Sequence, residues 1–116
     1  MAHPSRPPAR LLDWRPLVKG SLLGFAKVQF SSGLIMAEIG VHRGGHRVWA
    51  APPARLWLDR EADALVRDEL GNPKYQPIIE FANHGVRASW SRQVIRAVQL
   101  VHPALFSDMD EPSLDL

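Results

Sequence analysis

Basic side chains are the residues of this sequence whose type and spacing best suggest a chemistry. Arg55 follows a predicted strand, Lys74 lies beyond a charged insert, and Arg92 and Arg96 stand one helical turn apart. Such cations can contact the phosphates of a nucleic acid, which supplies affinity rather than sequence selectivity. The alternative is a solvated helix face with scattered loop charges.

The distribution of charge agrees with a polyanionic partner. The chain has fourteen basic and twelve acidic residues. Because four of the acids fall in the last nine positions, residues 1–106 hold fourteen cations against eight acids, or +6. Eleven of the cations are arginine, whose planar fork suits phosphate and stacks on bases. The acidic residues of the tail are Asp108, Asp110, Glu111 and Asp115.

Aromatic residues offer a second way to hold a nucleic acid. Phe25 and Trp49 fall in predicted strands, where an open sheet face would let them stack on unpaired bases. The competing interpretation is that both rings pack into a core or a dimer interface.

Signatures of catalysis and of metal binding are missing from the sequence. There is no cysteine, and the Gly44-Gly45 pair lacks the lysine and the flanking pattern of a phosphate loop. His42 and His46 flank that pair without an adjacent third ligand, so we read them as turn residues. The acids between 59 and 69 lack the spacing of a calcium loop. The sequence therefore predicts no enzyme, no catalytic residue, no metal and no cofactor.

Three segments have the two-residue period of half-buried strands, and tight turns join them. Residues 22–30, 34–41 and 47–51 alternate in side-chain character, and glycine-containing turns separate them. The pattern predicts an antiparallel meander. Residues 75–81 are expected to add a fourth strand, with Pro77 at an edge or a bulge.

A helix is expected to follow the strands. From about 83–85 to just before Pro103 the apolar residues recur with a helical period. The sequence thus predicts an α+β fold: a small antiparallel sheet of about four strands with a C-terminal amphipathic helix on one face. The other sheet face would stay partly apolar and form a homodimer by edge pairing or face packing. Its expected residues are Phe25, Lys27, Leu34, Met36 and Trp49.

The expected organisation is one domain with two appendages. Residues 1–19 are interpreted as a proline- and arginine-rich arm, in which Trp14 anchors the chain to the body. Residues 20–103 form the domain, and an irregular insert at 59–73 leaves open whether 59–70 is helical or an extended arm. Residues 104–116 are expected to be a mobile acidic tail.

Five segments and the order of the elements carry a resemblance to a known family. The segments are GFAKVQF (24–30), IGV (39–41), GG (44–45), WAAPPAR (49–55) and YQPIIEF (75–81). With this order of elements, the chain resembles the SpoVG (septation protein) family of small bacterial proteins. That resemblance implies a dimeric sheet-plus-helix fold associated with DNA and RNA binding. The family's basic motif follows the third strand; here Arg55 keeps its arginine, whereas Ala54 stands at the lysine position.

Two functions follow as hypotheses. The first is a small cytoplasmic protein that binds DNA or RNA, acts as a regulatory or accessory factor and is a homodimer. The second is a non-enzymatic adaptor or inhibitor of phage or plasmid type that binds a protein partner through its sheet face or its insert. No segment has the length and apolarity of a membrane span, so no membrane partner is expected.

Overall fold

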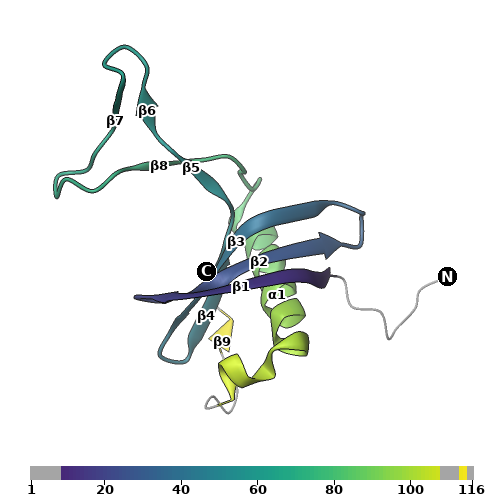
Figure 1. Cartoon of the computed structure of the whole chain (residues 1–116). Coiled ribbons are helices and arrows are strands. Elements are labelled where there is room, and N and C mark those ends of the chain that lie inside the picture. Colours follow the sequence, from purple (N-terminus) through teal and green to yellow (C-terminus); the bar gives the residue numbers. More distant parts are fainter. Residues whose placement is uncertain (1–8, 108–112, 115–116) are drawn as a thin grey trace.

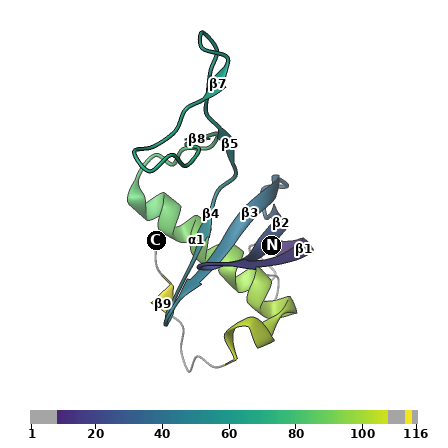
Figure 2. The ribbon, with the colours of Figure 1, turned by 60° about the vertical axis from the view of Figure 1, so that its left-hand side comes forward.

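The computed structural model describes residues 9–107 and 113–114 of the chain. A twisted sheet has the strand order β1-β2-β3-β4-β9, with antiparallel pairing between successive members of β1–β4 and parallel pairing of β9 with β4. One helix, α1, lies across one face of this sheet (Figures 1 and 2). The predicted α+β class and the helix on one face are thereby confirmed. The elements are β1 (Ala9–Lys19), β2 (Leu22–Phe30), β3 (Ile35–Gly44), β4 (Arg47–Ala51), α1 (His84–Val101) and β9 (Ser113–Leu114).

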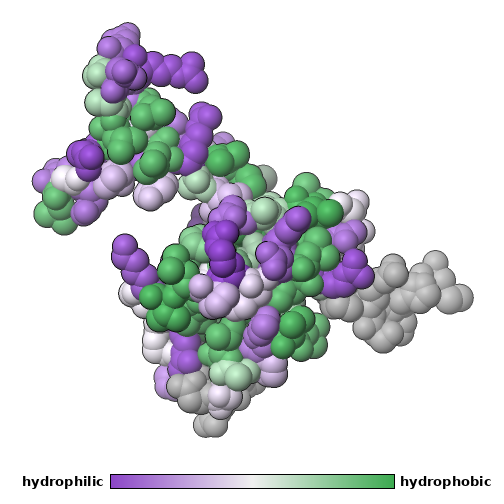
Figure 3. Space-filling view, viewed as in Figure 1, coloured by the Kyte–Doolittle hydropathy of each residue, from purple (hydrophilic) through white to green (hydrophobic). Residues whose placement is uncertain are grey.

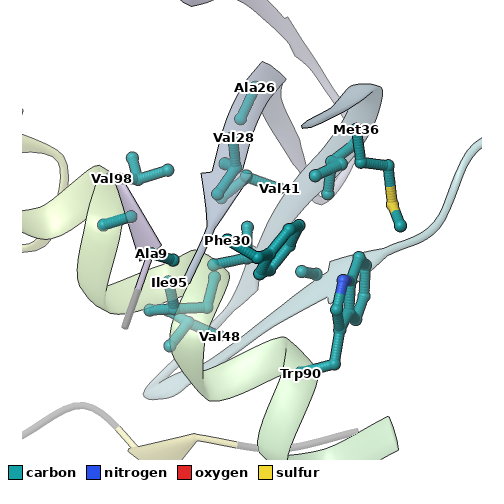
Figure 4. Packing of buried hydrophobic residues seen from close by; sticks show 14 of the residues in the cluster. Ala9, Ala26, Val28, Phe30, Met36, Val41, Val48, Trp90, Ile95 and Val98 are labelled. Atoms are coloured by element: carbon teal, nitrogen blue, oxygen red, sulfur yellow. The ribbon is translucent and has the colours of Figure 1, made fainter. Parts of the chain in front are cut away.

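The hydrophobic core lies between the sheet and the helix. Alternation in β2 turns Ala26, Val28 and Phe30 toward α1, where the helical period presents Ile95 and Val98. These side chains interlock in Figure 4. Complete burial of an aliphatic side chain of this size contributes about 1.5–3 kcal/mol, so this layer supplies most of the stability of the fold.

Local sequence signals set the ends of α1 as predicted. The Asn83 side chain accepts a hydrogen bond from the Val86 N–H at 2.9 Å, which satisfies one of the free donors of the first turn. The helix ends at Val101, and His102 caps it ahead of Pro103. Inside the helix the buried Ser91 hydroxyl accepts the N–H of Ala50 at 2.9 Å, which ties α1 to β4.

The first strand was not predicted. Residues 1–19 were expected to form an arm, but Ala9–Lys19 is an edge strand of the sheet. Pro16 is tolerated because an edge strand does not need every N–H for pairing. Trp14 packs toward the core over Gly24, where a Cβ atom would lie only 2.7 Å from the ring. Trp14 is therefore a packing residue as expected, but it belongs to a strand. Residues 1–8 lie outside the described part of the chain.

A bulge in β3 reverses part of the expected side-chain pattern. The pairing shifts between Ala26 and Val28, opposite Ile39 and Met36, so β3 has one extra residue there. Glu38 adopts a left-handed φ of 57° at this point. As a result Met36, which was expected on the face away from the helix, is buried in the core, and Ile35 is exposed.

The segment between β4 and α1 is an extended arm, which settles the question left open for residues 59–70. Residues 54–77, called the arm below, project from the body (Figure 1). Its strands pair only with one another, β5 with β8 and β6 with β7. The expected fourth strand at 75–81 is therefore wrong in extent and place. The elements of the arm are β5 (Ala54–Leu56), β6 (Leu58–Asp59), β7 (Ala64–Leu65) and β8 (Tyr75–Pro77).

The C-terminal segment is only partly described. A short 3-10 helix, η1 (Pro103–Phe106), buries Phe106 in the core. Ser113 and Leu114 pair with Arg47 and Val48 of β4. The prediction of a tail that starts at residue 104 is therefore wrong for these segments, while its four acids lie outside the described residues.

Candidate nucleic-acid interface

The face of the sheet opposite α1 carries charged and aromatic side chains. Cross-strand partners point to the same side of a sheet, so the register assigns each residue to a face. Figure 3 shows hydrophilic and hydrophobic residues interspersed over the body and the arm. The residues that the register places opposite α1, called the open face below, include Arg10, Asp13, Arg15, Lys19, Leu22, Phe25, Lys27, Gln29, Glu38, His42, Arg47 and Trp49.

The open face is partly apolar, as expected, because Leu22, Ile35, Phe25 and Trp49 lie on it, but two of the expected residues lie elsewhere. Phe25, Lys27 and Trp49 lie on it as predicted. Leu34, however, precedes β3 in an exposed turn, and Met36 is buried on the helix side. The bulge in β3 is the physical reason that Met36 turns inward, and it does not follow from an unbroken two-residue period.

A stacked ring pair lies at the β3–β4 side of the open face. His42 and Trp49 are cross-strand partners, with ring centroids 5.4 Å apart and planes inclined by 4°. Ser21 Oγ lies 2.9 Å from His42 Nδ1 and fixes the imidazole. Gly40 makes room for it, because a Cβ there would lie 3.1 Å from His42 Nε2. Partial burial lowers the pKa of His42, so the ring is neutral at pH 7. The result is a rigid, uncharged aromatic platform.

A second aromatic group lies at the β1–β2 side. The Arg15 guanidinium sits 5.1 Å from the centroid of the Phe25 ring and donates to Glu38 at 2.8 Å. Both charged side chains are well exposed, so the ion pair adds little stability. With Asp13 and Lys27 these residues line a shallow hollow over the strands. The hollow presents a ring and a guanidinium plane, the groups on which nucleobases stack.

Positive charge predominates on the open face. Its five cations outnumber its two acids, which gives a balance of +3. The Arg10 guanidinium donates to Gln29 at 3.2 Å, an exposed contact that a phosphate can replace. Lys27 is exposed beside it on β2. The cations are Arg10, Arg15, Lys19, Lys27 and Arg47, and the acids are Asp13 and Glu38.

The four cations predicted to bind phosphate are divided between two places. Arg55 pairs with Gln76 and Trp57 with Lys74, so Arg55 and Lys74 share one face of the arm. Arg92 and Arg96 are exposed on α1, which covers the opposite side of the sheet from the open face. The structure thus brings each pair together and does not gather all four on one surface.

The cations of β1 were not predicted to belong to the interface. Arg10 and Arg15 were assigned to an unstructured arm, so they were not considered for the interface. A weak signal was present, because Arg10 and Leu11, and then Asp13, Trp14 and Arg15, alternate between polar and apolar residues. Proline at positions 4, 7, 8 and 16 obscured it.

No further chemistry is evident in the described residues. Within 9–107 and 113–114 there is no group of three or more histidine or acidic side chains close enough to hold a metal. His46 is exposed in the β3–β4 turn. Asp59 Oδ1 accepts the N–H groups of Glu61 and Ala62, which marks a turn rather than a ligand set.

Comparison with known proteins identifies no relative. No protein-family model matches the chain, and no curated protein or solved structure matches it significantly. Across the part of the chain that the structure describes, no helix is both long and apolar enough to cross a membrane.

Proposed function

We propose that the protein binds single-stranded nucleic acid across its open face. The observation that carries the proposal is the combination of aromatic rings and excess positive charge on a sheet face that α1 leaves uncovered. Single-stranded nucleic acids bind to such surfaces by stacking bases on rings and by placing phosphates beside cations. The regulatory or accessory role and the cytoplasmic location are parts of the proposal.

The shape of the surface favours a single strand over a duplex. Trp49 with His42, and Phe25 with Arg15, offer flat groups at two sides of a sheet, which unpaired bases can reach and stacked base pairs cannot. Duplex recognition usually places a helix or a two-stranded ribbon in the major groove. The solvent-exposed cations of α1, Arg92 and Arg96, are the alternative site for that mode.

The direct test is fluorescence anisotropy of labelled single- and double-stranded DNA and RNA over a series of salt concentrations. We expect the single strands to bind more tightly, with affinity that falls as salt rises. Replacing Arg10 and Lys27 by alanine should weaken binding and reduce the magnitude of the log–log salt slope by up to about 1.4, because each lost phosphate contact removes about 0.7.

A matched control is available on the other side of the domain. The double variant Arg92→Ala, Arg96→Ala removes the same charge from α1 and should leave single-strand binding nearly unchanged. If it weakens binding while the Arg10, Lys27 variant does not, the interface lies on the helix. Absence of binding at low salt, with the fold intact by circular dichroism, would refute the proposed function.

Protein binding is a second candidate function, favoured by the arm. Leu56, Leu58 and Tyr75 are exposed there on a segment that contributes nothing to the core. Large exposed apolar patches often mark the sites where a protein binds another protein.

A further inference from the structure

The hollow over the first three strands holds both acids of the open face. Its lining comes from Asp13 and Arg15 of β1, Phe25 and Lys27 of β2, and Glu38 of β3. Carboxylates repel phosphate, so an interface that only followed the backbone of a nucleic acid would be weakened by them. Their position beside an aromatic ring therefore needs an explanation other than phosphate binding.

The backbone of β3 sets the position of Glu38. The strand has its extra residue opposite β2 at this point, and Glu38 adopts a φ of 57°. Residues other than glycine seldom take this conformation, and those that do are concentrated at functional sites. A bulge often serves to re-aim a side chain. Here the Glu38 carboxylate accepts both N–H groups of the Arg15 fork, at 2.8 and 3.4 Å.

Both carboxylates keep acceptor capacity for a ligand. A carboxylate has about four lone-pair sites, and Arg15 uses one on each oxygen of Glu38. Within residues 9–107 and 113–114 the Asp13 carboxylate has no hydrogen bond or ion pair. Both acids are exposed. The hollow thus combines hydrogen-bond acceptors with the flat group formed by Arg15 and Phe25, which lie 5.1 Å apart.

Guanine is the nucleobase whose edge fits a carboxylate. Its Watson–Crick edge presents the ring N1–H and the amino N2–H side by side, and one carboxylate can accept both. Cytosine and adenine place a ring-nitrogen acceptor next to their amino group. Thymine and uracil have a single N–H between two carbonyl oxygens. In these other bases an acceptor would face the carboxylate, which is unfavourable.

We propose that the hollow binds a guanine base of the single strand. The base stacks on the Arg15–Phe25 group and donates its N1–H and N2–H to Glu38, with Asp13 as a second acceptor. This inference rests on the proposed function, because Arg10 and Lys19 lie on either side of the hollow along β1 and would hold the neighbouring phosphates. It adds a base preference to a surface that would otherwise bind strands of any sequence.

The first test uses the unmodified protein and fluorescence anisotropy. Three labelled thymine strands of about twelve nucleotides, a usual length for a single-strand site, differ only at one central base, which is guanine, hypoxanthine or thymine. Hypoxanthine keeps the N1–H of guanine but lacks its amino group. The guanine strand should bind about fivefold or more tighter than the thymine strand, and hypoxanthine should lose most of this gain. Equal affinities for the three strands would overturn the proposal.

A conservative variant tests the part played by Glu38. Glu38→Gln keeps the size of the side chain but replaces one acceptor oxygen by a donor, so the ratio of guanine-strand to thymine-strand affinity should fall to about one. Glu80→Gln removes the same charge at an exposed position outside the hollow and should keep the ratio of the parent protein. If both variants keep that ratio, with the fold intact by circular dichroism, Glu38 does not recognise the base.

Free nucleotides separate this inference from the proposed function. In NMR titrations of the full-length protein, guanosine monophosphate should shift the amide signals of Phe25, Lys27 and Glu38 at lower concentration than uridine monophosphate does. Strands that bind without a preference for guanine would refute the guanine site and leave the proposed function standing. If no strand binds at low salt but guanosine monophosphate still shifts these signals, the guanine site is supported and the proposed function is wrong.

Discussion

The body and the arm of this protein are built from similar residues but reach different states. In the body, strand residues such as Val28 and Val41 are covered by α1 and are completely buried. In the arm, Leu56 and Leu58 also occupy paired strands, yet they remain in contact with water. The difference is a second layer. A strand stabilises a fold only when something packs on its apolar face.

The comparison also separates two kinds of surface. The open face of the body has no second layer either, but its outward residues are mainly charged or polar and are compatible with water. The arm has apolar residues in the equivalent position. The first surface fits a charged, aromatic-stacking ligand, and the second fits another protein surface.

The largest effect is expected from truncating a core side chain between α1 and the sheet, because the arm has no such packed layer. Ile95→Ala removes a completely buried side chain between α1 and the sheet and should lower the free energy of unfolding by about 2–5 kcal/mol. Excision of the arm, with residues 55–76 replaced by Asn-Gly between the paired residues Ala54 and Pro77, should change the free energy of unfolding of the body by less than about 1 kcal/mol, because no arm residue lies in the core. Urea unfolding followed by circular dichroism, at a concentration where both proteins are monomeric, measures both values. A larger loss on excision than on Ile95→Ala would show that the arm is part of the folding unit.

A smaller effect is expected at the polar contact between helix and sheet. Ser91→Ala leaves the Ala50 N–H buried without its acceptor, which should cost about 1–3 kcal/mol. Ser89→Ala is the matched control on the same helix, where the hydroxyl is exposed, and should cost less than about 0.5 kcal/mol. Equal costs in urea unfolding would mean that the Ser91 hydrogen bond does not hold α1 to β4.

The smallest effect concerns pH and distinguishes two histidines of the β3–β4 hairpin. Burial lowers the pKa of His42, so the unfolded chain binds more protons than the native protein near and below pH 6.5. Well above pH 6.5 His42 is neutral in both the native and the unfolded state, so it does not destabilise the protein. The free energy of unfolding falls as the pH drops through 6.5 toward the native pKa. The urea midpoint should decline from pH 7.5 to 5.5, less so in His42→Gln. His46→Gln, at an exposed turn position, should keep the decline of the parent protein.

Periodicity predicted the parts of the fold in which local and tertiary preferences agree. Residues 22–30 have the two-residue period of a strand and form β2 with the predicted bounds, and the alternation is interrupted only by a register shift between Leu22 and Gly24. The helix follows from its apolar stripe, its cap at Asn83 and the stop at Pro103. Ala9–Lys19 was missed because the prolines at positions 4, 7, 8 and 16 suggest an irregular chain, and only the pairing with β2 makes it a strand.

The candidate interface was predictable in kind but not in place. Phe25, Lys27 and Trp49 were expected on an open sheet face and lie there. Arg10 and Arg15 join them only because β1 adds to the sheet. Glu38 has a left-handed backbone conformation, which in a sequence is usually indicated by glycine. Because no glycine stands at this position, the bulge that buries Met36 and exposes Ile35 could not be predicted.

The sequence by itself determined the strands of the meander, the turns between them, the helix and its ends, and an excess of positive charge before the tail. Each of these depends on interactions between neighbours in the chain. The tertiary structure alone decided which face of each strand is buried, that the first segment pairs with β2, and that residues 54–77 project as an arm. Those outcomes depend on contacts between residues far apart in the sequence, whose free energy is gained only when the layers assemble.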